Sequence, residues 1–422
     1  MMQRRELLMG AAGLCALAAT PNSKAATKAR VLVVGGGYGG TTAAKYLRLF
    51  SGGAIEVVLI EPETAFVSCP MSNLVVAGIW QMADITRSYA ELTSKHGVSV
   101  VRDRVTAIDV EKCVATLAAG PALRFDKLVL SPGVGMVWDA IDGLKAAHDS
   151  GQILHAWNAG PETAALRRQL QEMSDGGVFA ISIPEAPYRC PPGPYERACL
   201  VADYFKKVKP RAKVLVLDAN EDVTSKPALF KAAWKERYAG MVEYRPQCKA
   251  VGVDAATNTI KFELADDVKA DVLNVLPEMR AGAIAVASGL ANSNGRWASV
   301  NYLNFESTAA KHIHVIGDAI QIVNAIPKSG HMANAQAKVT AAAIVAELGD
   351  AELDPAPMLT NTCYSFVDAE HAVHVASVHQ YLAAEKTYKT VPGAGGLSAA
   401  ASEMEARYAY NWARTIWADL LS

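Results

Sequence analysis

The sequence has no excess of either charge, few aromatic residues and no block rich in lysine and arginine. Its 422 residues include 41 Lys and Arg against 42 Asp and Glu, a formal net charge of -1, and only 7% aromatic side chains. Nucleic-acid-binding surfaces need clustered basic residues, so we expect no nucleic acid partner. Hydrophobic residues make up 51% of the chain, which indicates a globular protein with a large core. The expected partners are small molecules or another protein.

Long apolar runs are absent after the N-terminus. A helix that spans a bilayer needs about 20 apolar residues, and no later segment offers 18 of them without charge, so no stable membrane insertion is expected. The apolar run Leu7–Ala19 is too short to span, and it follows Arg4 and Arg5. This pattern predicts a twin-arginine export signal over residues 1–26, and hence a periplasmic protein. A short N-terminal anchor helix is the alternative.

The histidines and cysteines do not have the spacings of metal or haem sites. The chain has nine histidines and seven cysteines, without an HxxxH or CxxCH motif. We therefore expect neither a metal nor a haem to be bound by this chain itself. In an oxidising compartment the cysteines can form disulfides.

A dinucleotide-binding pattern opens the mature chain. The strand-like Arg30–Val34 leads into a turn with Gly35, Gly37 and Gly40, then a helix-like segment, and a second strand that ends at Glu61. Gly35 permits a tight turn, Gly37 lets the backbone approach a pyrophosphate, and Gly40 lets helix and strand pack closely. Glu61 stands where a carboxylate can accept hydrogen bonds from ribose hydroxyls. A glycine-rich turn without a ligand is the alternative.

Two later segments indicate that the dinucleotide is FAD. Leu123–Leu130 is followed by Pro132 and Gly133, and the strand-like His312–Ile316 is followed by Gly317 and Asp318. The pair resembles the later signatures of the disulfide-reductase-like flavoproteins, which have two dinucleotide-binding domains. That resemblance implies that Asp318 meets the ribityl chain of FAD.

A helix downstream adds two candidate flavin contacts. Lys328 and Gly330 precede the helix-like Ala335–Leu348, whose N-terminal dipole could face the flavin. An ordinary capped helix is the alternative.

The middle of the chain repeats the strand, helix, strand pattern but lacks the glycine fingerprint. Between the strand-like Gly176–Ile183 and the helix-like Tyr195–Lys207 lies a proline-rich loop with Cys190. A pyrophosphate needs bare backbone at this turn, so we predict a nicotinamide-like domain that binds no nicotinamide. Electrons must then enter from another donor.

Four segments together resemble one family. They surround Cys69, Cys190, Lys328 and Cys363, in the runs Phe66–Asn73, Tyr188–Arg197, Pro327–Gly330 and Asn361–Ser365. Over essentially the whole mature chain the sequence resembles the flavoprotein subunit of flavocytochrome c sulfide dehydrogenases, relatives of the sulfide:quinone oxidoreductases. The resemblance implies a sulfide dehydrogenase that oxidises sulfide to sulfur or polysulfide. It also implies a heterodimer with a c-type cytochrome subunit, which alone carries haem c. The alternative is a sulfide:quinone oxidoreductase on the periplasmic membrane face.

The resemblance also assigns roles to the cysteines. It implies that Cys69 tethers FAD covalently, and that Cys190 and Cys363 form the redox-active disulfide that sulfide attacks. A buried structural Cys69 and a local Cys190–Cys199 bridge are the alternatives. Glu196, on the Cys190 loop, is a candidate proton acceptor, or simply a glutamate in the first turn of a helix.

The fold class expected is α/β, with two Rossmann-like domains and a smaller α+β C-terminal domain. We expect an FAD domain over residues 27–141 and 283–353, a nicotinamide-like domain over 142–282 and an interface domain over 354–422. The last helix, Ser402–Leu421, contains Trp412 and Trp417. The resemblance places the cytochrome contact here, which makes both tryptophans candidates for electron transfer, with helix packing as the alternative.

Overall fold

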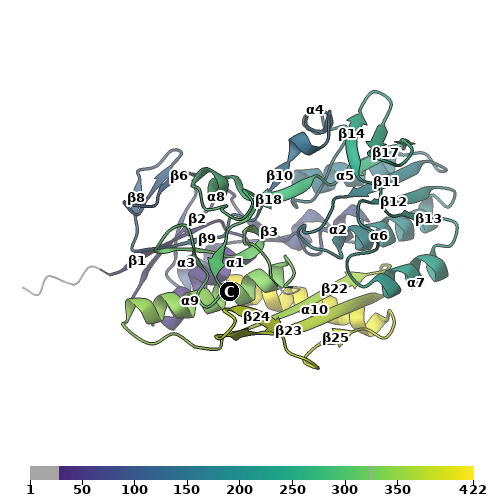
Figure 1. The fold of residues 1–422 in the computed structure, drawn as a ribbon. Coiled ribbons are helices and arrows are strands. Elements are labelled where there is room, and N and C mark those ends of the chain that lie inside the picture. The colour runs from purple at the N-terminus through teal and green to yellow at the C-terminus, as the bar shows by residue number, and fades with distance from the viewer. Residues whose placement is uncertain (1–27, 324–325) are drawn as a thin grey trace, which may run out of the picture.

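The protein is described here from a computed structural model, for residues 28–323 and 326–422. The expected export signal, residues 1–26, lies outside this range. Figure 1 shows three neighbouring parts. The N-terminal sheet and its helices lie on the left, a second sheet with its helices lies on the right, and the yellow C-terminal sheet lies below both.

The first part is built on a seven-stranded sheet. One of its inner strands is β1 (Arg30–Val34), in which Val31 to Val34 are buried because both faces of a parallel sheet are covered. β1 pairs in parallel with β2 and β9, and β9 pairs in parallel with β21. The order is β19 (Val300–Asn301), β20 (Glu306–Ser307), β21 (Ile313–Val315), β9 (Lys127–Leu130), β1, β2 (Glu56–Ile60), β5 (Ser99–Val101). Segments far apart in the sequence therefore share one sheet.

Helix α1 (Tyr38–Phe50) follows β1 and packs against α9 (Gly330–Leu348). α1 begins at Tyr38, directly after Gly37, and no side chain caps its first turn. Its N-terminal N–H groups are thus available to a ligand. α9 is capped by Ser329, whose hydroxyl accepts the N–H of Met332 at 3.1 Å.

The second part has a parallel sheet of four strands. Its order is β13 (Val242–Arg245), β12 (Lys213–Asp218), β11 (Val178–Ile183), β17 (Val272–Val275). Its helices are α4 (Leu144–Asp149), α5 (Pro161–Glu172), α6 (Gly193–Val208) and α7 (Pro227–Arg237). The antiparallel pair β10 (Val134–Val137) and β18 (Glu278–Ala281) joins this part to the first.

Small antiparallel sheets and short helices complete these two parts. The sheets are β3 (Phe66–Val67) with β4 (Thr86–Arg87); β6 (Val105–Asp109), β7 (Val114–Leu117) and β8 (Leu123–Arg124); and β14 (Ala250–Asp254), β15 (Thr259–Phe262) and β16 (Val268–Lys269). The short helices are α2 (Ser72–Val76), α3 (Ala90–Ser94) and α8 (Ala283–Ala287).

The C-terminal part is an antiparallel sheet covered by one helix. β22 (Met358–Phe366) pairs with β23 (Ala372–Leu382), which also pairs with β24 (Thr387–Thr390) and β25 (Gly396–Leu397). Helix α10 (Glu403–Leu421) packs on β22 and β23. β22 contacts both α9 of the first part and α6 of the second. One strand therefore reaches the place where all three parts meet (Figure 1).

The structure confirms the α/β fold class with two Rossmann-like parts and a smaller α+β part. The domain boundaries stay a prediction. Within the described residues, no helix has both the length and the apolarity needed to cross a membrane.

Candidate active site

A cavity that is partly open to solvent lies where the three parts meet, and its volume is about 1260 Å³ when the open mouth is included. Most of the residues that the sequence singled out line it, although they come from distant segments. They are Gly37, Cys69, Gly133, Cys190, Glu196, Gly317, Asp318, Gly330, Cys363 and Trp412. The fold thus brings three thiols, one carboxyl group from each Rossmann-like part and the glycine turn to one space.

The three glycines of the first turn have different surroundings. Gly35 has φ +100°, and a methyl group there would lie 2.3 Å from Ser131 O. A methyl group on Gly40 would lie 1.8 Å from Gly35 O, whereas one on Gly37 would meet nothing within 4 Å. Gly35 and Gly40 therefore allow close backbone packing, and Gly37 faces the open space of the cavity. That space, beside the uncapped start of α1, fits a pyrophosphate.

The two acidic residues proposed for the cofactor differ in their partners. Glu61 ends β2, and its carboxylate accepts the N–H groups of Gly36 at 2.5 Å and Glu63 at 2.8 Å. It lies behind the glycine turn and is not among the residues that line the cavity. Asp318 lines the cavity, and its buried Oδ1 has no hydrogen-bond partner within the part of the chain that is described. Burial raises the pKa of Asp318. A ligand hydroxyl would satisfy this acceptor, which fits the ribityl chain of a flavin.

The other expected cofactor contacts divide into two groups. Gly133 and Gly317, both with positive φ, and Gly330 line the cavity. Pro132 and Lys328 do not. Lys328 instead points behind the wall, where Nζ donates to Asp318 O at 2.9 Å and to Ile320 O at 2.6 Å.

Burial lowers the pKa of Lys328 to about 7, and its ammonium group lies 3.6 Å from the centroid of a Trp297 ring. These contacts make it a support of the loop that carries Asp318.

Cys69 lies between β3 and α2, at the wall of the cavity. It is partly exposed, and its sulfur accepts the N–H of Ala159 at 3.5 Å. A thiol in this position can react with a molecule in the cavity.

Cys190 and Cys363 approach the cavity from different parts. Cys190 follows β11 in a strained conformation with φ +60°, and its N–H donates to Lys328 O at 2.8 Å. Cys363 lies on β22, and its sulfur accepts the side-chain N–H of Asn361 at 3.3 Å. Burial, and then the charge of Cys363, raise the pKa of the Cys190 thiol. Both are free thiols in the structure, so the disulfide stays a prediction.

Cys199 has different surroundings, although it was the nearer partner in sequence. It is fully buried on α6, and burial raises the pKa of its thiol. Cys199 does not line the cavity, whereas Cys190 and Cys363 both do.

Glu196 lies in the first turn of α6 and is almost completely buried. Its two carboxylate oxygens accept the N–H of Phe366 and the side-chain N–H of Asn73, each at 2.8 Å. Burial raises the pKa of this carboxyl group, although both hydrogen bonds lower it. A carboxyl group with a raised pKa beside two thiols is a better proton acceptor than an exposed carboxylate.

A fully buried arginine supports this wall and was not predicted. Arg197 donates to Asn73 Oδ1 at 2.9 Å, and to His155 O, Asn274 Oδ1 and Ala156 O at 2.7–2.8 Å. No sequence signal separates this arginine from a solvent-exposed one, because it follows Glu196 in an ordinary helical segment.

The two tryptophans of α10 differ in position. Trp412 lines the cavity, near His331 and Tyr364. Trp417 is buried behind the wall, and its Nε1 donates to Tyr38 Oη at 3.1 Å. Trp417 therefore packs in the core, and only Trp412 reaches the cavity.

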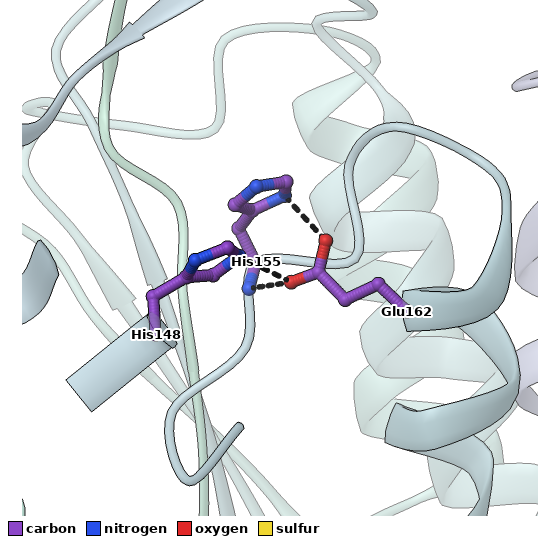
Figure 2. Close-up of side chains that lie close together, drawn as sticks. All are labelled: His148, His155 and Glu162. Atoms are coloured by element: carbon purple, nitrogen blue, oxygen red, sulfur yellow. Dashed lines mark hydrogen bonds and ion pairs between the residues drawn. The ribbon is translucent and has the colours of Figure 1, made fainter. Parts of the chain in front are cut away.

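Three potential metal ligands that the sequence did not connect lie together in the second part. Figure 2 shows Glu162 beside His148 and His155, with one carboxylate oxygen 3.3 Å from His148 Nε2 and the other 3.3 Å from His155 Nδ1. The imidazole rings are stacked, parallel within 2°. His155 Nδ1 also accepts the N–H of Trp157 at 2.9 Å. In-plane lone pairs of stacked parallel rings do not converge on one point, so we assign no metal here.

A two-part dinucleotide-binding fold, closed over a cavity with three thiols, defines the class of disulfide-oxidoreductase-like flavoproteins. Residues 29–161 match the family model of the pyridine nucleotide-disulphide oxidoreductases. Residues 163–277 match the central domain of the flavoprotein chain of sulfide dehydrogenase (flavocytochrome c), and residues 355–421 match the flavin-binding domain of flavocytochrome c sulphide dehydrogenase. The chain belongs to the flavoprotein superfamily of flavocytochrome c sulfide dehydrogenases and sulfide:quinone oxidoreductases.

Individual relatives agree with this placement. The chain is 61% identical over 46 residues to the sulfide dehydrogenase (flavocytochrome c) flavoprotein chain of Chlorobaculum thiosulfatiphilum, covering 11% of this chain and 94% of that sequence. It is 23% identical over 303 residues to the mitochondrial sulfide:quinone oxidoreductase of Dictyostelium discoideum, covering 68% of this chain and 65% of that protein. The crystal structure of the sulfide:quinone oxidoreductase of Aquifex aeolicus has the same fold, with a TM-score of 0.78 at 17% identity over 93% of this chain and 91% of that one.

Proposed function

We propose that this protein oxidises sulfide through a Cys190–Cys363 disulfide and a bound FAD, and passes the electrons to a c-type cytochrome. One observation carries the proposal: Cys69, Cys190 and Cys363 line the same cavity, together with a glycine turn that can hold a dinucleotide. A purely structural set of cysteines would not need access to one space.

The residues present fit FAD at this site. Gly37 and the start of α1 would hold the pyrophosphate, and Asp318 would accept from the ribityl chain. The Cys69 thiol, on the same wall, would lose its proton and form a thioether with the 8α-methyl carbon of the flavin. That carbon would lose a proton, and the electron pair would stay on the flavin ring, which the electron acceptor would reoxidise. Bound FAD supplies a two-electron acceptor that can release the electrons one at a time.

The cysteine pair carries out the first step. HS⁻ attacks one sulfur of the Cys190–Cys363 disulfide, so that a new S–S bond forms and the cysteine–cysteine bond breaks. One cysteine keeps the added sulfur as a persulfide, and the other leaves as a thiolate that holds the electron pair. Glu196 can take the persulfide proton because burial raises its pKa. Bound FAD would supply the acceptor for this electron pair, while the persulfide keeps the added sulfur.

An apolar stripe on α10 supports a protein acceptor. Met404 and Tyr408, each 51% exposed, stand four residues apart, and Trp412 follows after four more. Positions i, i+4 and i+8 lie on one helix face, so the stripe leads from the surface to the cavity wall. Such a stripe can receive a partner that carries a haem.

Quinone is the second candidate acceptor. It is kept because the longest matches among the relatives are to sulfide:quinone oxidoreductases, at 23% identity. The exported location proposed from Arg4 and Arg5 is compatible with either acceptor.

Anaerobic titration with sulfide tests the proposal. We expect sulfide to bleach the flavin absorbance of the purified protein. Cys190→Ser and Cys363→Ser should abolish bleaching by sulfide but not by dithionite, while Cys113→Ser, outside the cavity, should behave as wild type. Bleaching by sulfide in Cys363→Ser would refute the role of the pair. Native purification then identifies the acceptor: a co-purified c-type cytochrome supports the proposal, whereas a lone flavoprotein that reduces ubiquinone supports the alternative.

A further inference from the structure

Lys226 is a buried lysine next to the cysteine pair. It is 3% exposed and directly precedes Pro227, the first residue of α7. Its φ of +55° is unusual for a residue with a side chain. Such conformations persist only where surrounding contacts hold them, and they cluster at functional sites. Nothing in the sequence around Lys226 distinguishes it from a surface lysine.

The ammonium group of Lys226 points at the strand that carries Cys363. Nζ donates to Cys363 O and to Ser365 Oγ, each at 3.0 Å. Both acceptors are neutral, and within the described ranges 28–323 and 326–422 Lys226 forms no ion pair. A buried charge without an ion-pair partner is costly, so negative charge that develops nearby would stabilise this ammonium group.

The groups whose charge acts on Lys226 include the three of the proposed reaction, Cys363, Glu196 and Cys190. Burial lowers the pKa of Lys226, while negative charge on Cys363, and then on Glu196, Cys190 and Glu405, raises it. In return, Lys226 lowers the pKa of Cys190, as Arg189 does from the loop of Cys190 itself. The attraction is strongest toward Cys363, the residue whose carbonyl group it already contacts.

We propose that Lys226 is a positioning residue that stabilises the negative charge of the opened cysteine pair. The inference rests on the proposed function. The closed disulfide is neutral, and attack by HS⁻ adds one negative charge, which the released thiolate carries after the S–S bond breaks. The ammonium group of Lys226 compensates this charge without moving, because it is already held by the backbone of Cys363 and the hydroxyl of Ser365.

Alkylation of the reduced protein tests the inference without sulfide and without an electron acceptor. The purified protein, with its flavin, is reduced and treated with iodoacetamide between pH 5 and 10, and mass spectrometry measures the rates at Cys190 and Cys363. An opposite charge within about 4–6 Å favours a thiolate by about one pH unit or more. In Lys226→Met, which removes the charge but keeps a long unbranched side chain, we expect the pH of half-maximal alkylation at Cys190, whose pKa Lys226 lowers, to rise by about one unit. Below that pH, alkylation should be about ten-fold slower.

Two further variants separate charge from packing. Lys226→Arg keeps the charge and should retain the wild-type profile. Lys231→Met removes an exposed cation from α7, the helix that Lys226 precedes. Lys231 is paired with Asp222, and this variant should also show the wild-type alkylation profile. If Lys226→Met does not fold, Lys226→Gln is the neutral variant to measure.

An unchanged alkylation profile in a folded neutral variant would overturn the inference. An equal shift of the profile in Lys231→Met would also overturn it, because any lysine on this side of the protein would then change the alkylation of the cysteines. The proposed function can fail separately. If the alkylation profile shifts in Lys226→Met but sulfide does not bleach the flavin of the wild-type protein, the role of Lys226 is supported and sulfide oxidation is refuted.

Discussion

The same added methyl group should have different effects at two glycines of one turn: it should lower stability at one and ligand affinity at the other. Gly40 and Gly37 are three residues apart, but an alanine methyl group would lie 1.8 Å from a carbonyl oxygen at Gly40 and meet nothing within 4 Å at Gly37. Gly37 has φ -79°, which alanine adopts without strain. Gly40→Ala is therefore predicted to damage the fold, and Gly37→Ala only the ligand site.

The magnitudes follow from these distances. At Gly40 the backbone of Gly35 must move by more than 1 Å to reach van der Waals distance, and overpacking of that kind costs about 3 kcal/mol or more. At Gly37 the change in stability without flavin should stay within about 1 kcal/mol. The methyl group there would occupy the space for the pyrophosphate, and we expect FAD affinity to fall at least about ten-fold, or ~1.4 kcal/mol.

Both variants are best measured in a Cys69→Ser background, where flavin can be removed. Thermal unfolding of the flavin-free proteins gives the stability, and titration with FAD, followed by quenching of flavin fluorescence, gives the affinity. If Gly37→Ala binds FAD as tightly as its parent, the pyrophosphate does not lie over Gly37. If Gly40→Ala has the same unfolding temperature as its parent, Gly40 does not pack closely against the backbone of Gly35.

Three further predictions concern the tether, the electron path and the response to pH. Cys69→Ser should release all its flavin on acid precipitation, whereas wild-type protein should keep it; yellow colour lost from wild type would refute the tether. Trp412→Leu should slow reduction of cytochrome c but leave flavin bleaching by sulfide at the wild-type rate, and slower bleaching would assign Trp412 to packing. Burial lowers the pKa of His155 to about 3 from an ordinary 6.5, so the unfolded chain binds a proton there that the folded protein does not. Stability should therefore be lost as pH falls from about 6.5 toward 3, by at most about 5 kcal/mol. Urea unfolding of His155→Gln should show a smaller loss over this range, and an equal loss would contradict the assignment.

Local sequence predicted much of the first part because the physics there is local. The apolar strand Arg30–Val34 and the glycines after it are sufficient to predict a buried parallel strand and a tight turn into a helix. Their spacing also predicts that Gly37 faces a ligand, and Gly37 does line the cavity. The position of Cys363 beside Cys190 came only through resemblance to a family, because no local pattern brings together residues 173 positions apart.

The sequence does not predict in which direction long side chains point. Lys328 lies in the expected loop, but it donates to two backbone carbonyl groups behind the cavity wall. Lys226 and Arg197 stand in ordinary polar segments, and only tertiary packing makes them buried cations. A sequence shows that a long side chain is present, whereas its direction depends on neighbours from other parts of the chain.

The shared position of β22 has a consequence for synthesis and folding. β9 receives its second neighbour, β21, only after about 180 further residues have been made, and Cys363 follows later still. Pairings over such distances form slowly, because the intervening chain must first become ordered. A chain interrupted before β22 could complete the sheet that faces the dinucleotide and still lack the second thiol of the pair. The cavity is therefore complete only after both Rossmann-like parts and β22 have been made.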